Sequence, residues 1–153
     1  MKLKVLTISI IGLIVISISY LYITRNTPLL YRSVDRASVE RSGIVIQNPF
    51  RERGPEDRAE QVLQELKDGK CEKALTGLEE DASTIAYACE REGQYPLQSW
   101  SLADRQDFGS QVVLVYKVYR NDHGDTKALP ALAWIDIKKV GEDWRALSYQ
   151  TYY

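Results

Sequence analysis

The stretch that decides the fold is one amphipathic helix signal. Residues 55–69 read PEDRAEQVLQELKDG. Pro55 suits the first helical position, and Gly69 suits the left-handed residue that often ends a helix. Apolar residues recur at helical spacing between them: Ala59, Val62, Leu63 and Leu66. This pattern predicts a helix over residues 55–68 with one face buried against another layer of the protein.

Two shorter helices are predicted directly afterwards. The same spacing recurs over residues 71–78 and 82–89, with Gly93 as a second helix stop. Cys71 and Cys89, the only cysteines, fall on these two apolar stripes. We expect a disulfide between them, closing a loop of about 17 residues worth roughly 3 kcal/mol in the chain-entropy model. Two buried free thiols are the alternative.

The acidic run Glu79-Glu80-Asp81 joins these two predicted helices. Carboxylates can hold calcium, but no further hard ligands occur at calcium-loop spacing. The run therefore favours a solvated helix junction over a metal site.

From residue 97 onward the pattern changes to strands. Residues 97–104, 111–120, 128–140 and 144–153 are predicted strands, separated by turn residues at 121–125 and 141–143. Pro130 requires an edge position or a bulge, because proline has no N–H for a sheet ladder. The fold class is therefore α+β, with helices first and an antiparallel meander after them.

This order of elements resembles the nuclear transport factor 2-like (cystatin-like α+β) cone, over roughly residues 55–153. Two stretches carry the resemblance, AEQVLQELKDGKCEKAL at 59–75 and GEDWRAL at 141–147. The resemblance implies a curved sheet wrapped against the first helix, and a homodimer as one partner arrangement. The superfamily includes enzymes, ligand binders and small anchored bacterial proteins, so the fold does not select the function.

An uncharged apolar run precedes this domain. Residues 5–24 carry no charge, and twenty helical residues cross a hydrocarbon core of roughly 30 Å. The run predicts a transmembrane helix over 5–24, after a cytoplasmic tail at 1–4 and before a stalk at 25–54. Two apolar islands in the stalk, at 28–31 and 44–46, are expected to contact the domain or a neighbouring protein. A signal peptide is the alternative, with Ser17 and Ser19 as the small-residue pair that precedes the cleavage site.

Charge and cysteine usage predict the location. The basic residues flanking the run are almost evenly balanced, so the positive-inside rule does not orient it. The expected disulfide indicates an oxidising compartment, which places the amino terminus in the cytoplasm and the domain outside a bacterial inner membrane. Without Lys2 and Lys4, eighteen basic residues face twenty-one acidic ones. This acidic balance without a basic stripe excludes nucleic-acid binding.

Candidate functional residues fall into two hypotheses. The first is a protein interface, formed by small residues on one face of the span and tyrosines at the end of the last strand: Ser9, Gly12, Ser19, Tyr149, Tyr152 and Tyr153. The alternative for the tyrosines is cover of the concave sheet face. The second hypothesis is a small-molecule-binding or isomerase-like cavity near Tyr116 and Asp136.

Other catalytic signals are weak. His123, the only histidine, lies in a predicted hairpin turn, which favours a solvated residue over a general base. The sequence has no Ser-His-Asp set, phosphate loop or zinc-ligand spacing, so no cofactor or metal is expected. We expect a non-catalytic accessory or scaffold subunit whose partners are the lipid bilayer and other subunits of a membrane complex.

Overall fold

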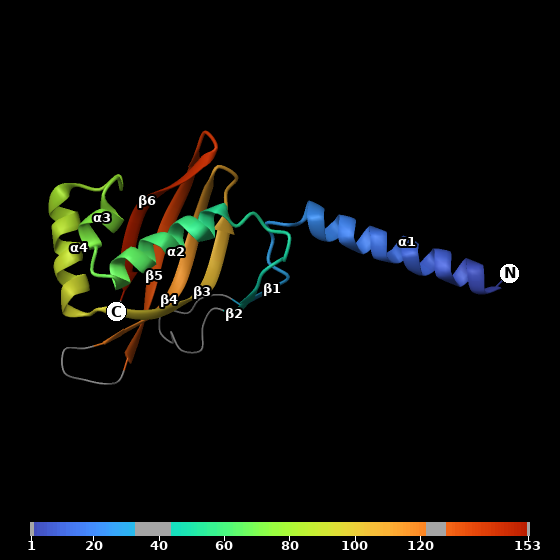
Figure 1. Ribbon diagram of the computed structural model, residues 1–153, viewed down its shortest axis with the longest axis horizontal. Helices are drawn as coiled ribbons and strands as arrows, with labels where there is room; N and C mark the ends of the chain where they lie inside the picture. Colours follow the sequence, from blue (N-terminus) through green and yellow to red (C-terminus); the bar gives the residue numbers. More distant parts are fainter. Residues whose placement is uncertain (1, 33–43, 122–127, 153) are drawn as a thin grey trace.

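The computed structural model describes residues 2–32, 44–121 and 128–152. Within these ranges the side chains of residues 2–8, 31–32, 44–45, 128–129 and 152 lie outside the description. A long helix leads through a small hairpin into three helices packed against one four-stranded sheet (Figure 1).

The sheet is an antiparallel meander of consecutive strands, as predicted. Its order is β3 (Leu97–Asp107), β4 (Gln111–Asn121), β5 (Ala128–Val140) and β6 (Asp143–Tyr152). The register shifts between Leu102 and Asp104 on β3, and between Asp136 and Ile137 on β5. Such irregularities increase the local twist of a sheet and bend it. The sheet therefore presents a concave face to the helices.

Pro130 lies on an inner strand, because β5 pairs with both β4 and β6. It pairs with Tyr119 of β4, whereas the pairing of β5 with β6 ends at Leu132 and Tyr152. Among the described residues, the proline therefore lies beyond the last β5–β6 pair, where β5 pairs with β4 alone. The predicted edge position holds locally, although the strand as a whole is central.

Helix α2 (Gly54–Lys67) crosses the concave face, as the sequence predicts. Its buried residues Ala59, Val62 and Leu63 join a core built with alternate residues of the strands. Gly69 has a φ of 73° just after the helix, and its N–H donates to the carbonyl of Leu66. The predicted glycine stop of α2 is confirmed.

Helices α3 (Cys71–Leu75) and α4 (Ala82–Gln94) close one end of the cone. Cys71 and Cys89 form a disulfide with a Cα–Cα separation of 5.5 Å. The predicted bond is confirmed. The predicted stop at Gly93 is wrong, because α4 continues to Gln94 and the N–H of Tyr95 donates to the carbonyl of Arg91.

The amino-terminal part contains helix α1 (Lys2–Ile23), β1 (Leu30–Arg32) and β2 (Ile44–Ile46). By length and hydropathy together, no helix in the described part of the chain qualifies as a membrane span. The two apolar islands of the predicted stalk pair with each other, since β1 and β2 form an antiparallel hairpin. The stalk at residues 25–54 stays a prediction, and its described part contains this pair of strands.

Gly54 should be intolerant of a side chain. A Cβ at this position would collide with the indole of Trp144, whereas a Cβ at Gly93 would meet no atom within 4 Å. We expect Gly54→Ala to lower the free energy of unfolding by about 1–3 kcal/mol through overpacking. Gly93→Ala, the matched control, should be neutral or stabilising by less than about 1 kcal/mol because alanine favours helix. Urea unfolding followed by tryptophan fluorescence measures both, and equal midpoints would contradict the packing.

Candidate functional site

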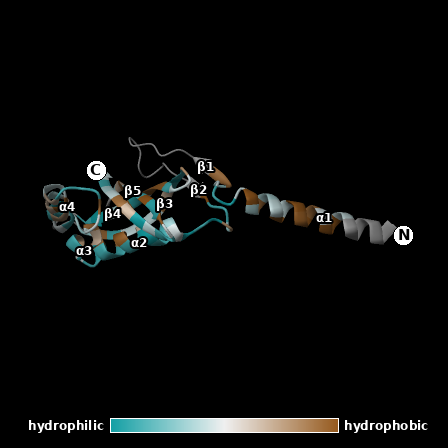
Figure 2. Ribbon diagram, turned by 90° about the horizontal axis from the view of Figure 1, so that it is seen from above, coloured by the Kyte–Doolittle hydropathy of each residue, from teal (hydrophilic) through white to brown (hydrophobic). Residues whose placement is uncertain are grey.

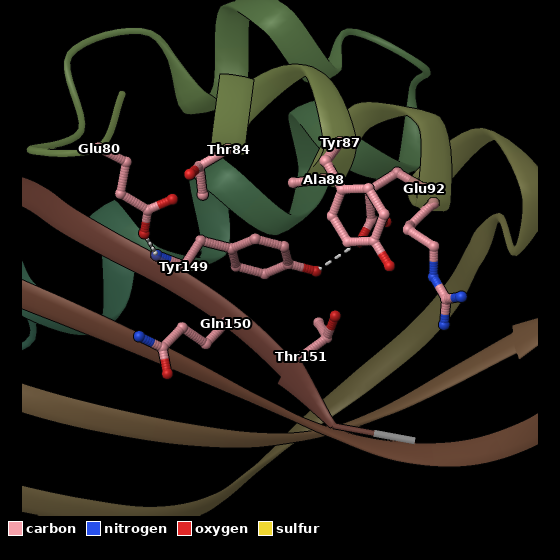
Figure 3. A pocket seen from close by; sticks show the side chains of 9 residues that line it. Glu80, Thr84, Tyr87, Ala88, Glu92, Tyr149, Gln150 and Thr151 are labelled. Carbon is pink, nitrogen blue, oxygen red and sulfur yellow. Dashed lines mark hydrogen bonds between the residues drawn. The ribbon is translucent and has the colours of Figure 1, made fainter. Parts of the chain in front are cut away.

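The described part of the domain has a pocket of about 350 Å³ between α4 and the end of β6 (Figure 3). Helix α4 contributes one wall and the concave side of β6 the other. The lining residues are Glu80, Thr84, Tyr87, Ala88, Arg91, Glu92, Tyr149, Gln150 and Thr151. This volume lies within the range of small-molecule sites.

A buried cluster of Glu92, Arg120 and Tyr149 adjoins this pocket. Nη1 and Nη2 of Arg120 donate to Oε2 and Oε1 of Glu92, the latter at 2.8 Å. The Tyr149 hydroxyl accepts from Arg120 Nη2 at 2.6 Å and donates to Glu92 Oε1 at 2.8 Å. A further bond joins Arg120 to the carbonyl of Tyr95. The cluster therefore links α4, β4, β6 and the loop after α4.

The geometry of this cluster favours a role in holding the helix and strands together over a role in proton transfer. Both carboxylate oxygens of Glu92 already accept bonds from the buried guanidinium of Arg120. A substrate proton would have to compete with Arg120 for the same oxygens. The cluster cross-links the closed end of the cone.

The acidic run at 79–81 serves the fold. The N–H of Glu79 donates to the carbonyl of Leu147, and Glu80 Oε1 accepts the N–H of Tyr149. These contacts continue the hydrogen bonding of β6 on its outer edge. Asp81 caps α4 by accepting the N–H of Thr84 at 2.9 Å, and the bonds from Ser83 and Thr84 lower the pKa of Asp81 to about 2. Within the described chain, no cluster of three or more metal-ligating side chains occurs.

Tyr116 and Asp136 do not share a cavity. Tyr116 pairs with Ala133, and both belong to the core on the concave face. Asp136 pairs with Val113, one residue out of phase with that face, and accepts a bond from Ser148 at 2.9 Å. Since successive side chains of a strand point to opposite faces, the two groups lie on opposite sides of the sheet. Burial raises the pKa of Tyr116, which keeps its phenol protonated.

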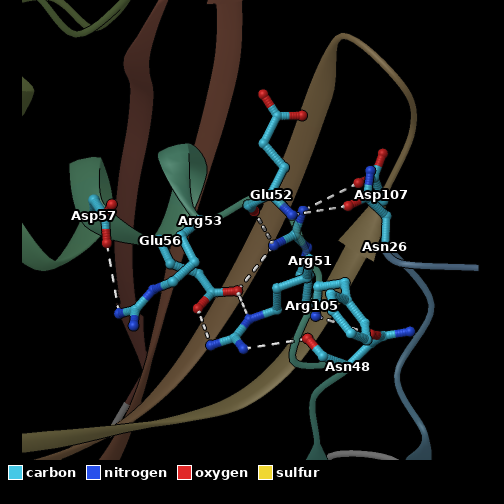
Figure 4. Close-up of polar contacts among 10 residues, drawn as sticks. Asn26, Asn48, Arg51, Glu52, Arg53, Glu56, Asp57, Arg105 and Asp107 are labelled. Atoms are coloured by element: carbon cyan, nitrogen blue, oxygen red, sulfur yellow. Dashed lines mark hydrogen bonds and ion pairs between the residues drawn. The ribbon is translucent and has the colours of Figure 1, made fainter. Parts of the chain in front are cut away.

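A second polar centre joins α1 to the domain (Figure 4). Asn48 is fully buried, and its Nδ2 donates to the carbonyl of Leu21 at 2.8 Å and to that of Thr24 at 3.4 Å. Its Oδ1 accepts the N–H of Phe50 at 2.9 Å. The last carbonyls of a helix have no partner within the helix, so Asn48 satisfies that of Leu21 from outside. The carbonyl of Thr24, just after the helix, also accepts the N–H of Thr27. A side chain 24 residues or more away thus fixes the end of α1.

Glu56 anchors the other side of this junction. Arg51 binds both of its carboxylate oxygens, at 2.6 and 2.7 Å, and Arg105 reaches Oε1 at 2.8 Å. Arg105 also donates to the carbonyl of Glu52 at 2.8 Å. The bond to Glu56 raises the pKa of Arg51. These ion pairs connect the chain after β2 to α2 and β3, and we call Asn48, Arg51, Glu56 and Arg105 the junction cluster.

The remaining predicted site residues are distributed as follows. Tyr149 is buried on the concave face, so the alternative of covering that face holds for it. The side chain of Tyr152 and the whole of Tyr153 and His123 lie outside the described residues. Ser9, Gly12 and Ser19 lie exposed on α1, and their role against a partner helix stays a prediction.

Neither polar cluster follows from local sequence periodicity. Glu92 and Arg120 are 28 residues apart, and Arg105 and Glu56 are 49 apart. One signal was present: Arg120 follows Val112, Leu114, Tyr116 and Val118 in the two-residue alternation of β4. A charge at a core position requires a buried counter-ion.

Comparison with known proteins supports the architecture. The fold matches a designed protein of the nuclear transport factor 2-like class with a TM-score of 0.51. The chain has a nuclear transport factor 2-like fold. The match covers 66% of this chain and all of the designed one, at 9% sequence identity, so it concerns the fold alone. No protein-family model matches the chain, and no curated protein matches it in sequence.

The Glu92 cluster should be essential to the fold. Glu92→Gln would leave the buried Arg120 charge without its counter-ion, and we expect it to lower the free energy of unfolding by about 3–5 kcal/mol. Asp57→Asn breaks the exposed ion pair with Arg53 and should change it by less than about 1 kcal/mol. Urea denaturation compares the two variants. A loss for Glu92→Gln no larger than that for Asp57→Asn would contradict the assignment.

Proposed function

We propose that the protein is a membrane-anchored, non-catalytic accessory or scaffold subunit of a bacterial membrane protein complex. Helix α1 is the anchor, and the nuclear transport factor 2-like domain lies outside the cytoplasm. The observation that carries the proposal is the apolar surface of α1, which extends away from the domain (Figure 2).

Apolar side chains lie on every side of the part of α1 whose side chains are described, which carries no charge and has Ser9, Ser17 and Ser19 as its serines. Most of these apolar side chains are exposed. The large exposed ones are Ile10, Ile11, Leu13, Ile14, Val15, Ile16, Ile18, Tyr20, Tyr22 and Ile23. A helix that is apolar all round requires an apolar environment, either a membrane or the interior of a larger assembly. In the sequence, the uncharged run from residue 5 to residue 24 has the length of a membrane-spanning helix, although no helix in the described part of the chain qualifies as a span. A lipid bilayer satisfies both the length and the absence of a polar face.

The end of α1 supports the same assignment. Tyr20 and Tyr22 lie in its last turn, and Arg25 is the first charge after the run. Tyrosines are enriched where a membrane helix reaches the water interface. The disulfide Cys71–Cys89 favours an oxidising compartment for the domain.

A scaffold role is favoured over catalysis by how the charged groups of the domain are used. Glu92 is paired with Arg120, Glu56 with two arginines, and Glu80 with the backbone of β6. The small residues Ser9, Gly12 and Ser19 share one face of α1, where a second helix can approach closely. The domain would thus be displayed at the membrane while α1 contacts other subunits.

The test is purification of the intact protein from native membranes in mild detergent, after extraction at alkaline pH to remove peripheral proteins. We expect it to resist alkaline extraction and to retain a stoichiometric protein partner. Gly12→Leu should release the partner without releasing the protein from the membrane, because it fills the small-residue face. Ile14→Leu, on another face of α1, is the matched control. An intact protein that purifies alone would contradict the proposal.

Ligand binding in the pocket between α4 and β6 is the second candidate function. It is favoured by the pocket's size and by its mixture of Tyr87, Arg91 and Glu80 with apolar surface. It replaces the cavity predicted near Tyr116 and Asp136, which the two faces of the sheet separate. Such a pocket suits a small apolar or aromatic molecule with one polar group.

Mass spectrometry of the purified protein tests for a retained small molecule. Tyr87→Ala should then lose the ligand, because the exposed Tyr87 ring forms one wall of the pocket. Phe108→Ala, which removes an equally exposed ring in the β3–β4 turn, should retain it. A ligand retained equally by both variants would place it elsewhere.

A further inference from the structure

We propose that the domain rests directly on the lipid headgroup surface through an apolar collar around the end of α1. The collar consists of Tyr22, Leu29, Leu30, Ile46 and Phe50. This inference rests on the proposed membrane anchoring and adds a second contact with the bilayer, made by β1, β2 and their flanking residues.

The collar concentrates apolar exposure in one region. Its five side chains are between 43% and 58% exposed. In the described residues from 51 onward, the large apolar side chains that are exposed are Tyr87, Phe108 and Val140. These three occur singly, on α4, in the β3–β4 turn and at the end of β5. Clustered apolar exposure marks an interaction surface, whereas scattered exposure is normal.

The structure holds the collar in place from within. The rings of Tyr22 and Phe50 meet edge to face with centroids 6.4 Å apart. Leu30 and Ile46 are cross-strand partners, and the N–H of Leu29 donates to the carbonyl of Ile46 at 2.8 Å. Asn48, which lies between Ile46 and Phe50 in the sequence, donates to the carbonyl of Leu21 near the end of α1. The apolar side chains are therefore presented outward by a hydrogen-bonded frame.

Continuity with α1 identifies the partner as lipid. Tyr22 belongs to both the last turn of α1 and the collar, so the two apolar surfaces meet at this residue. The guanidinium of Arg25 lies 5.3 Å from the Tyr22 ring centroid and donates to its hydroxyl. An aromatic ring with an adjacent cation is suited to the boundary between acyl chains and phosphates. A protein partner on the collar is the alternative that the test separates.

The collar would fix how the domain faces the membrane. With α1 upright and the collar at the headgroups, α4 and its pocket lie at the end of the domain farthest from α1 (Figure 1). The pocket would then open away from the lipid, where soluble ligands or partners reach it.

Depth-dependent quenching tests this placement on the full-length chain. Single cysteines replace Phe50, Ile46 or Tyr87, and each is labelled with a polarity-sensitive fluorophore. Both native cysteines are in the disulfide and do not react. The protein is reconstituted into phosphatidylcholine vesicles with lipids spin-labelled just below the headgroup. We expect the fluorophore emission of Phe50→Cys and Ile46→Cys to be blue-shifted relative to that of Tyr87→Cys. The spin-labelled lipids should also quench this emission several-fold more strongly than that of Tyr87→Cys.

Each outcome separates the two proposals. If the collar probes are quenched no more than the Tyr87→Cys probe while alkaline extraction leaves the protein in the vesicles, the collar proposal is wrong and the anchor stands. If quenching at positions 46 and 50 appears only when the native partner is absent, a protein covers the collar and the lipid assignment is wrong. Release of the protein by alkaline extraction overturns both the anchor and the collar.

Discussion

The buried amide of Asn48 is the constraint on which the relation between helix and domain depends. It binds the carbonyl of Leu21, a group that a helix end otherwise exposes to water, and the carbonyl of Thr24 just after the helix. Its own backbone carbonyl accepts the N–H of Arg51, whose guanidinium binds Glu56. A continuous set of polar contacts therefore runs from the last turn of α1 to the first turn of α2. These contacts fix the position of α1 relative to the domain, which a flexible linker would not do.

Several charged side chains of the domain join its helices to its sheet. Glu92 and Arg120 cross-link the closed end of the cone, and the disulfide joins α3 to α4 beside it. At the opposite end, Glu52 accepts bonds from Lys139 and Trp144, which fixes the β5–β6 turn against the start of α2. The bond from Lys139 lowers the pKa of Glu52, so this contact is present at neutral pH. A fold stabilised at both ends in this way suits the rigid module that we propose.

The sequence predicts elements whose determinants are local and misses contacts that depend on register. The limits of α2 follow from Pro55 and Gly69, and the disulfide follows from two cysteines on adjacent apolar stripes. The junction cluster could not be predicted, because Asn48 follows a segment without periodicity and its partners are 24 and 27 residues away. The prediction of a cavity at Tyr116 and Asp136 is wrong because of the register in which the two strands pair. Every even-numbered residue of β4 pairs with an odd-numbered residue of β5, and paired residues share a face of the sheet. An even-numbered residue of β4, such as Tyr116, and an even-numbered residue of β5, such as Asp136, therefore lie on opposite faces.

The most direct test of the account is the distance between α1 and the domain in lipid nanodiscs, measured by pulsed electron spin resonance. Spin labels at Tyr20→Cys and Phe108→Cys, both exposed positions, report on the two sides of the junction. A junction fixed by Asn48 predicts one narrow distance distribution, which broadens when Asn48→Ala removes the amide. A broad distribution in the otherwise unaltered protein, or one that Asn48→Ala leaves unchanged, would contradict it.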